Sequence, residues 1–343
     1  MIGLEYSVEK HILKLHKPAK TSRNVFEEKT HWLVKVWQSQ QKDIIGVGEA
    51  APLEFLSPDF RADLEVEITK TLNLLQQGHV LESLALQGLP AVKFAIESAM
   101  LDLAAGGKHI YFQSDYLRGR PIAINGLVWM NDLDAMLEEA FQKVKDGFDC
   151  IKFKVGSHDF DAECRFLERF RKQHPASQIQ IRLDANGVYL PDEALAQLKT
   201  LSRFEIHSIE QPIKKGQFYA MAKLCSDSKI PIALDEELIG VDVYKSGQTL
   251  LKEIKPQYLI LKPTLLGGFA NSNQWIELAE QLNIGWWVTS ALEGNIGLNA
   301  LSQWVGSLNT TMPQGLGTGM LYQNNFPAAS QIYRGKLYYK PKA

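Results

Sequence analysis

Five charged residues end short apolar runs in this chain, and they recur at nearly even intervals. They are Lys154, Asp184, Glu210, Asp235 and Lys262, and they lie 30, 26, 25 and 27 residues apart. Each interval is about the length of one strand, one loop and one crossover helix. In a closed parallel barrel, the carboxyl ends of all strands meet on one face, where active sites are built. The spacing therefore predicts that two lysines and three carboxylates converge on one pocket.

The three carboxylates predict a metal site. Asp184, Glu210 and Asp235 are hard oxygen donors, the type that Mg²⁺ binds while it keeps other positions for water or substrate. Buried carboxylates are rare unless they are paired or bind a metal. Three of them on successive strands are therefore expected to share one ion.

The lysines predict acid–base chemistry at the same pocket. Lys152 and Lys154 are two residues apart in a strand, so both face the barrel interior while Ile151 and Phe153 face the helices. Neighbouring cations and burial are expected to lower the pKa of such a lysine, which could then act as a general base. Lys262 is expected to approach from the opposite side. A metal ion and lysines suit removal of a proton next to a carboxylate, because both stabilise the enediolate charge.

From residue 121 onward, strands and helices alternate strictly, which predicts an α/β fold with a modified TIM (β/α) barrel. No glycine-rich phosphate loop opens the run, as an open doubly wound sheet would need. The eight expected strands cover 121–129, 150–156, 179–187, 204–212, 230–237, 257–263, 284–293 and 314–319.

The first 120 residues predict a separate α+β capping domain. Strands are expected at 2–15, 31–38 and 44–52, with a polar connection over 16–30, and helices at about 60–76 and 90–105. Residues 321–343 continue past the barrel and are expected to return to the cap. The predicted division is thus a capping domain over 1–120 with 321–343, and a catalytic barrel over 121–320.

The composition excludes several classes of protein. The formal charge of −2 over 343 residues shows no basic stripe, which argues against nucleic acid as a partner. No apolar run reaches the ~18 residues of a membrane span, and the N-terminus lacks signal-peptide features. A cytoplasmic enzyme acting on a small-molecule carboxylate is the expectation, and the sequence does not give its oligomeric state.

The ordered motifs resemble a known family. The strands carry K-F-K, D-A-N, E-Q-P, D-E and L-K-P in that order, which resembles the enolase superfamily in its muconate-lactonising-enzyme branch. Members of that superfamily use Mg²⁺ and a lysine or histidine base to form an enediolate, so the resemblance implies this mechanism for the chain. Within the branch, KPAKTSR, GEAAPL, PIAINGLVWM, TSALEGNIGLNA and GLGTGMLYQNNF resemble the o-succinylbenzoate synthases.

This resemblance implies a dehydratase of menaquinone biosynthesis, which converts 2-succinyl-6-hydroxy-2,4-cyclohexadiene-1-carboxylate to 2-succinylbenzoate by syn elimination. Lys154 would be the base, Lys262 would stabilise the enediolate, and Lys152 would assist Lys154. The metal carboxylates would bind Mg²⁺, with Mn²⁺ as an alternative. The resemblance also implies metal-ligand partners and substrate contacts: Asn186 and Glu236 for the former, and Thr21, Ser22, Arg23, Ser290 and Gly317 for the latter.

An N-succinylamino acid racemase or a dipeptide epimerase on the same scaffold is the alternative, because racemisation also uses lysines on two sides. Dipeptide epimerases place an Asp-x-Asp after the eighth strand, where this chain has QGLGTG. A histidine-based relative is excluded, since no histidine follows His207. Two departures from the synthase pattern are GEAAPL without its usual cysteine and Gly294 in place of serine. A non-catalytic binding protein would be expected to have lost one of the five charged positions.

Overall fold

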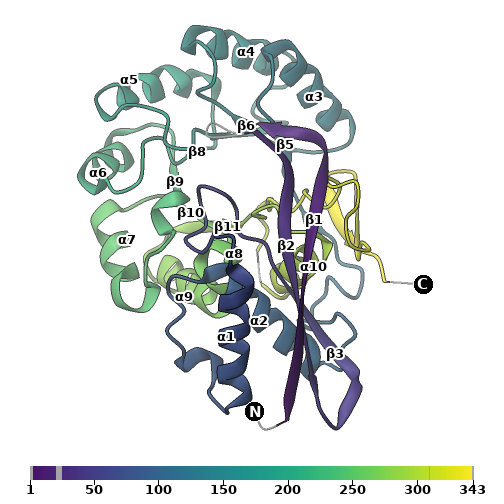
Figure 1. The fold of residues 1–343 in the computed structure, drawn as a ribbon. Helices are drawn as coiled ribbons and strands as arrows, with labels where there is room; N and C mark the ends of the chain where they lie inside the picture. The colour runs from purple at the N-terminus through teal and green to yellow at the C-terminus, as the bar shows by residue number, and fades with distance from the viewer. Residues whose placement is uncertain (1–2, 21–24, 309, 342–343) are drawn as a thin grey trace.

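The centre of the protein is a seven-stranded parallel sheet that curls into a half-barrel (Figure 1). The computed structural model describes residues 3–20, 25–308 and 310–341. Neighbouring strands follow one another in sequence. They are β5 (Gly126–Val128), β6 (Cys150–Lys154), β7 (Gln180–Asp184), β8 (Ser208–Glu210), β9 (Ile232–Leu234), β10 (Tyr258–Leu261) and β11 (Gly285–Val288).

Helices connect these strands and lie outside the sheet, as the alternating pattern predicts (Figure 1). Two of them begin with an aspartate cap: Asp132 accepts from the N–H of Ala135 at 2.9 Å, and Asp159 from that of Ala162 at 3.0 Å. None of the described helices combines the length and apolar character that a membrane span requires. The α-helices of the barrel are α3 (Leu133–Lys145), α4 (Phe160–Gln173), α5 (Pro191–Leu201), α6 (Phe218–Asp227), α7 (Gln248–Ile254), α8 (Pro263–Leu266), α9 (Gly268–Gln281) and α10 (Asn295–Ser307), with shorter helical turns at Ser202–Phe204, Glu236–Leu238 and Val243–Gly247. Another short turn, Leu81–Ser83, belongs to the cap.

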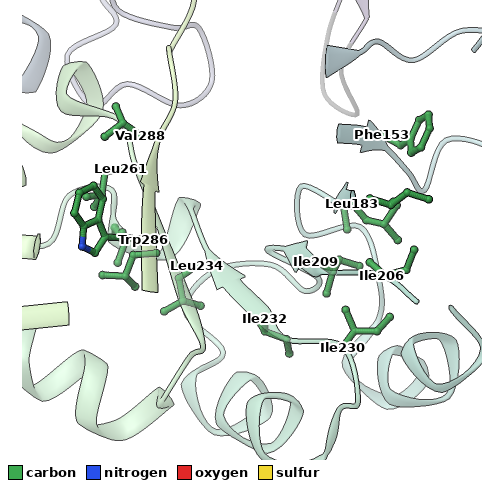
Figure 2. Packing of buried hydrophobic residues seen from close by; sticks show 14 of the residues in the cluster. Phe153, Leu183, Ile206, Ile209, Ile230, Ile232, Leu234, Leu261, Trp286 and Val288 are labelled. Atoms are coloured by element: carbon green, nitrogen blue, oxygen red, sulfur yellow. The ribbon is translucent and has the colours of Figure 1, made fainter. Parts of the chain in front are cut away.

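The main hydrophobic core fills the layer between the strands and the helices. Figure 2 shows Phe153, Leu183 and Ile209, among others, along successive strands of the sheet. The ring of Phe153 lies 5.0 Å from that of Phe166 and 5.2 Å from that of Phe170, both on α4. Because side chains alternate along a strand, this packing directs Lys152 and Lys154 into the barrel.

The eighth predicted strand is absent, and a pair of isolated bridges stands in its place. Gln314 bridges Ile124, and Gly315 bridges Thr289, so the segment still touches both sides of the opening in the sheet. Residues 315–319 are rich in glycine, which lacks a side chain to pack and loses much conformational freedom in a strand. The barrel is therefore closed by two bridges, and the prediction of a strand over 314–319 is wrong.

The predicted strand over 121–129 is divided in two. β4 (Ile122–Ala123) pairs with β13 (Lys336–Tyr339), which pairs with β12 (Ser330–Tyr333), whereas β5 belongs to the barrel. Between them the N–H of Asn125 donates to the carbonyl of Gln314 at 2.9 Å, which turns the chain from one sheet to the other.

Just before β12, residues 321–323 run along β1 of the cap, where the N–H of His16 donates to the carbonyl of Leu321 at 2.9 Å. We keep as a proposal the division of the chain into a capping domain, residues 1–120 with 321–343, and a catalytic barrel, residues 121–320.

The cap is an antiparallel sheet of β1 (Leu4–Lys20), β2 (Val25–Gln38) and β3 (Gln41–Ala50), packed on α1 (Leu64–Gln76) and α2 (Pro90–Ala104). The predicted polar connection over 16–30 is largely strand, because β1 runs to Lys20 and β2 starts at Val25. Its polarity misled the prediction: a two-stranded ribbon with one exposed face tolerates polar residues. Leu13, Leu15 and Phe26 supply the buried face of this ribbon.

Two glycines let β3 lie directly on the backbone of α2. A β-carbon on Gly48 would stand 1.9 Å from the carbonyl oxygen of Ala95, and one on Gly46 would stand 2.1 Å from that of Ala99. Carbon and oxygen cannot approach this closely, so any side chain would push the strand away from the helix.

Replacing Gly48 with alanine is expected to lower the free energy of unfolding by about 3 kcal/mol, because the strand and helix must separate to admit the methyl group. Urea denaturation followed by circular dichroism measures this change. Gly88→Ala is the matched control, since nothing lies within 4 Å of its β-carbon position. Equal stability of the two variants would contradict the close approach.

Candidate active site

The five charged residues converge at the carboxyl ends of five neighbouring strands, as predicted. Lys154 on β6 is in register with Asp184 on β7, which is in register with Glu210 on β8. Asp235 directly follows β9 and Lys262 directly follows β10. All five are buried or nearly so, with side chains between 2% and 13% exposed. The strands thus gather opposite charges on one face of the sheet.

The two lysines of β6 each contact carboxylates of the next strands. The ammonium group of Lys152 lies 2.6 Å from Glu210 Oε2 and 2.9 Å from Asp184 Oδ2. That of Lys154 lies 2.9 Å from Asp184 Oδ2 and donates to Asn186 Oδ1 at 2.8 Å. Asp184 is therefore shared by both lysines.

Lys262 contacts the same cluster from the side opposite to Lys152. Its ammonium group donates to Asp235 Oδ2 and lies 3.7 Å from Glu210 Oε1. Glu210 consequently lies between Lys152 and Lys262, with one oxygen toward each. Asn186, besides accepting from Lys154, donates to Glu236 Oε1 at 3.2 Å. The predicted partners Asn186 and Glu236 are thus in contact with each other at this cluster.

The charges in the cluster shift one another's pKa values. Burial disfavours the ionised form of Asp184, but Lys152, Lys154 and Lys262 outweigh it and hold the pKa of Asp184 below its usual range. Burial and the charge of Asp184 raise the pKa of Glu210 to about 7. For Lys152, burial lowers the pKa but Asp184 and Glu210 outweigh it, so the net shift is upward. The expectation of a lowered lysine pKa is therefore wrong for Lys152, because paired carboxylates dominate over neighbouring cations.

The chemistry of the carboxylates fits a divalent ion. Glu210 Oε1 is buried and accepts no hydrogen bond from the residues that the structure describes, which is costly for a carboxylate oxygen. In the present arrangement the lysines separate the acids, and within 3–20, 25–308 and 310–341 no three His, Cys, Asp or Glu side chains are gathered as a ready metal site. The donor set is nevertheless the all-oxygen type that Mg²⁺ prefers, on three adjacent strands.

A cavity of about 770 Å³ opens above the cluster. Lys152, Lys154 and Lys262 line its polar end, and apolar side chains of the cap, including Phe26, Leu53 and Leu56, line another wall. Such a cavity, largely apolar with a few convergent charges, has the size and character of a small-molecule site.

The predicted substrate contacts are placed only in part. Ser290 and Gly317 both line the cavity, and Ser290 Oγ accepts a hydrogen bond from Thr318 Oγ1 at 2.8 Å. Thr21, Ser22 and Arg23 lie outside the described residues.

Gln211 and Glu237 organise the acidic end of the sheet, although neither was predicted as a site residue. Gln211 is fully buried, and its Oε1 accepts from the N–H groups of Asp235 at 3.2 Å and Glu237 at 3.3 Å. Its Nε2 donates to Glu237 Oε2 at 3.0 Å. Because Gln211 follows Glu210 directly, it links the two carboxylate-bearing turns. The sequence signal that could have indicated Gln211 is its position as a polar residue directly after a buried strand.

Comparison with known proteins identifies the family. Residues 135–337 match the family model described as Enolase C-terminal domain-like. An o-succinylbenzoate synthase from Desulfotalea psychrophila is 40% identical, covering 98% of this chain and 99% of its own length. The crystal structure of MenC from Desulfotalea psychrophila superimposes with a TM-score of 0.85 at 37% identity, covering 98% of this chain and 99% of that chain.

A substrate-liganded L-Ala-D/L-Glu epimerase from Bacillus subtilis has the same TM-score, 0.85, with 21% identity over 99% of this chain and 98% of its own, and so shares the fold. The chain is a modified TIM barrel with an N-terminal cap and belongs to the enolase superfamily, within the o-succinylbenzoate synthase family.

Proposed function

We propose that this protein is a hydro-lyase that dehydrates 2-succinyl-6-hydroxy-2,4-cyclohexadiene-1-carboxylate to 2-succinylbenzoate in menaquinone biosynthesis, in the cytoplasm. The observation that carries the proposal is the pair of lysines, Lys154 and Lys262, that reach one carboxylate cluster from opposite sides at the end of a cavity. The 40% identity to an o-succinylbenzoate synthase supports the choice of substrate.

Lys154 is the proposed base and acid. It removes the proton on the ring carbon that bears the carboxylate, which leaves an enediolate. The same ammonium group then returns a proton to the departing hydroxyl, so that water leaves from the same face and the ring becomes aromatic. One group performing both transfers accounts for syn elimination.

Lys262 is proposed to stabilise the enediolate, and Lys152 to support Lys154. A doubly charged enediolate is stabilised best by cations that are already in place, because they need no reorganisation during the reaction. The hydrogen bond from Lys262 to Asp235 and that from Lys152 to Glu210 hold the two cations in such fixed positions.

Asp184, Glu210 and Asp235 would hold Mg²⁺, with Mn²⁺ as the alternative, and the bound ion supplies positive charge beside the substrate carboxylate. The buried Glu210 Oε1 without a hydrogen-bond donor supports this role. Crystal structures of dipeptide epimerases from Enterococcus faecalis and Cytophaga hutchinsonii are complexes with Mg and a dipeptide, which supports a divalent ion on this fold. Asn186 and Glu236 would orient the metal-binding carboxylates by contacting them on the side away from the ion.

The remaining substrate contacts are proposed at the opposite end of the cavity. Ser290 and the backbone at Gly317 would hold the succinyl carboxylate. Thr21, Ser22 and Arg23 would close over the substrate and exclude water. We propose no nucleic-acid or membrane partner.

Racemisation of N-succinyl amino acids is the second candidate, because lysines on two sides can exchange a proton on either face. An N-succinylamino acid racemase from Thermus thermophilus is 31% identical over 47% of this chain. Dipeptide epimerisation is less favoured, since residues 314–319 carry no carboxylate for a substrate ammonium group.

A paired assay separates these functions. The purified enzyme with Mg²⁺ is expected to remove the absorbance of the cyclohexadiene substrate, and EDTA is expected to stop the reaction. The same preparation is then incubated with N-succinyl amino acids, and loss of optical rotation is followed. An enzyme that racemises these compounds but leaves the cyclohexadiene unchanged would overturn the synthase proposal.

A further inference from the structure

The turn between β11 and α10 forms a wall of the cavity. Residues 289–292 all line it, and Leu292 adopts a left-handed backbone conformation with φ of 61°. A bulky residue rarely adopts this conformation, so the surrounding structure must hold it in place.

Lys29 of the cap holds this turn from the outside. It lies on β2, is 7% exposed, and its ammonium group donates to the carbonyl oxygens of Ala291 at 2.8 Å and Leu292 at 2.9 Å. The hydroxyl of Tyr322 also donates to the carbonyl of Leu292, at 2.8 Å. The cap thereby fixes two successive peptide groups of the cavity wall, including the left-handed one.

Glu293 holds the same turn from the inside. Its carboxylate is fully buried and accepts from Ser290 Oγ and Thr264 Oγ1, both at 2.5 Å, and from the N–H of Ala291. The N–H of Leu292 donates to Ser290 Oγ at 3.0 Å. The orientation of the Ser290 hydroxyl therefore depends on the conformation of the turn whose carbonyl groups Lys29 binds.

The charges around Lys29 explain how an ammonium group is tolerated here. Glu49 on β3 is fully buried; it bonds His31 Nδ1 at 2.5 Å and accepts from the N–H groups of Gly294 at 2.6 Å and Gly297 at 2.7 Å. Burial lowers the pKa of Lys29 to about 8, and the charges of Glu293 and Glu49 offset only part of this shift. A buried ammonium group is costly unless it has partners, and here two carbonyl groups accept from Lys29 while the two acids act on it through their charge.

We infer that Lys29 is a positioning residue for substrate recognition: it fixes the wall at Ser290, Ala291 and Leu292 through their backbone. This inference rests on the proposed function of the cavity. Among the described residues, no hydrogen bond or ion pair joins the turn to Lys152, Lys154 or Lys262, so Lys29 acts on the binding wall and leaves the proton-transfer groups in place.

The test is a kinetic comparison of Lys29→Met with Lys35→Met. Lys29→Met removes the donor to two buried carbonyl groups, so the turn relaxes, and KM is expected to rise about tenfold while kcat changes by less than about threefold. Lys35 lies on the same strand and pairs with Glu9, away from the turn, so its variant is expected to keep the wild-type KM. An unchanged KM in Lys29→Met, or a fall in kcat alone, would overturn the inference.

A double-mutant cycle with Ser290→Ala distinguishes positioning from general loosening. If Lys29 acts through the turn that orients Ser290, the double variant is expected to raise KM little more than the larger single effect; multiplied effects would contradict this. If Lys29→Met does not fold, Tyr322→Phe carries the test, with an expected KM rise of about threefold, and no rise overturns the inference.

The wild-type enzyme tests the proposed function separately. If it racemises N-succinyl amino acids and does not dehydrate the cyclohexadiene, the same kinetic comparison is made with the amino acid substrate.

Discussion

Lys154→Ala is expected to lower kcat/KM for the cyclohexadiene substrate by about 10⁴-fold, the upper range for a general acid–base group, because one lysine serves both proposed proton transfers. Alanine leaves no ammonium group beside Asp184 and Asn186 to replace it. Lys152 lies two residues away, but it is already bonded to Glu210 and Asp184. The loss is measured by steady-state kinetics in saturating Mg²⁺.

The control for this prediction is Lys145→Ala, an exposed position at the end of α3, which is expected to keep wild-type activity. Calorimetric titration with Mg²⁺ should show that Lys154→Ala still binds the ion, so that the loss lies in proton transfer. Activity within tenfold of wild type would show that another group is the base.

Glu210→Gln is expected to weaken Mg²⁺ binding by more than about 100-fold, which exceeds the usual effect of removing a group behind a ligand. Glutamine keeps the shape of Glu210 but removes one of the three negative charges that attract the ion. Isothermal titration calorimetry with Mg²⁺ alone measures the affinity. Glu168→Gln, an exposed position on α4, is the control and is expected to bind as wild type does.

The wild-type affinity for Mg²⁺ is also expected to depend on pH. The pKa of Glu210 is raised to about 7 by burial and by Asp184, and the ion requires the ionised carboxylate. Affinity should therefore fall as the pH drops below about 7, and this fall should be smaller in Glu210→Gln, where only the raised pKa of the buried Asp235 contributes. If calorimetry shows that Glu210→Gln binds Mg²⁺ as tightly as the wild type at neutral pH, Glu210 is not a ligand.

The convergence of charges could be predicted because it depends on only two rules. Parallel strands bring their carboxyl ends to one face, and alternation along β6 separates Lys152 and Lys154 from Phe153. The apolar runs and helix patterns therefore sufficed to place the lysines and carboxylates together. These rules use the order of residues along the chain and need no distances.

Other features depended on contacts that no local pattern contains. Lys29 reaches Ala291 across 262 positions of sequence, and the apolar alternation of β2 does not show which polar side chain will be buried. The pKa of Lys152 rises because of carboxylates on other strands, whose distances the sequence does not give. The strand over 314–319 is predicted because the barrel pattern requires an eighth strand, whereas glycine favours irregular backbone and the structure has only two bridges there.

The two-bridge closure of the barrel has a consequence for how this enzyme family can change. Gly317 and Thr318 border the cavity, yet they belong to no hydrogen-bonded ladder of the sheet. Substitutions in this segment can reshape the wall of the cavity without shifting the register of any strand that carries an acid–base group. With the roles proposed above, the residues for proton transfer and those for substrate preference thus lie on separate parts of the chain. Substitutions in residues 314–319 can therefore change which substrate is bound while the proposed reaction is retained.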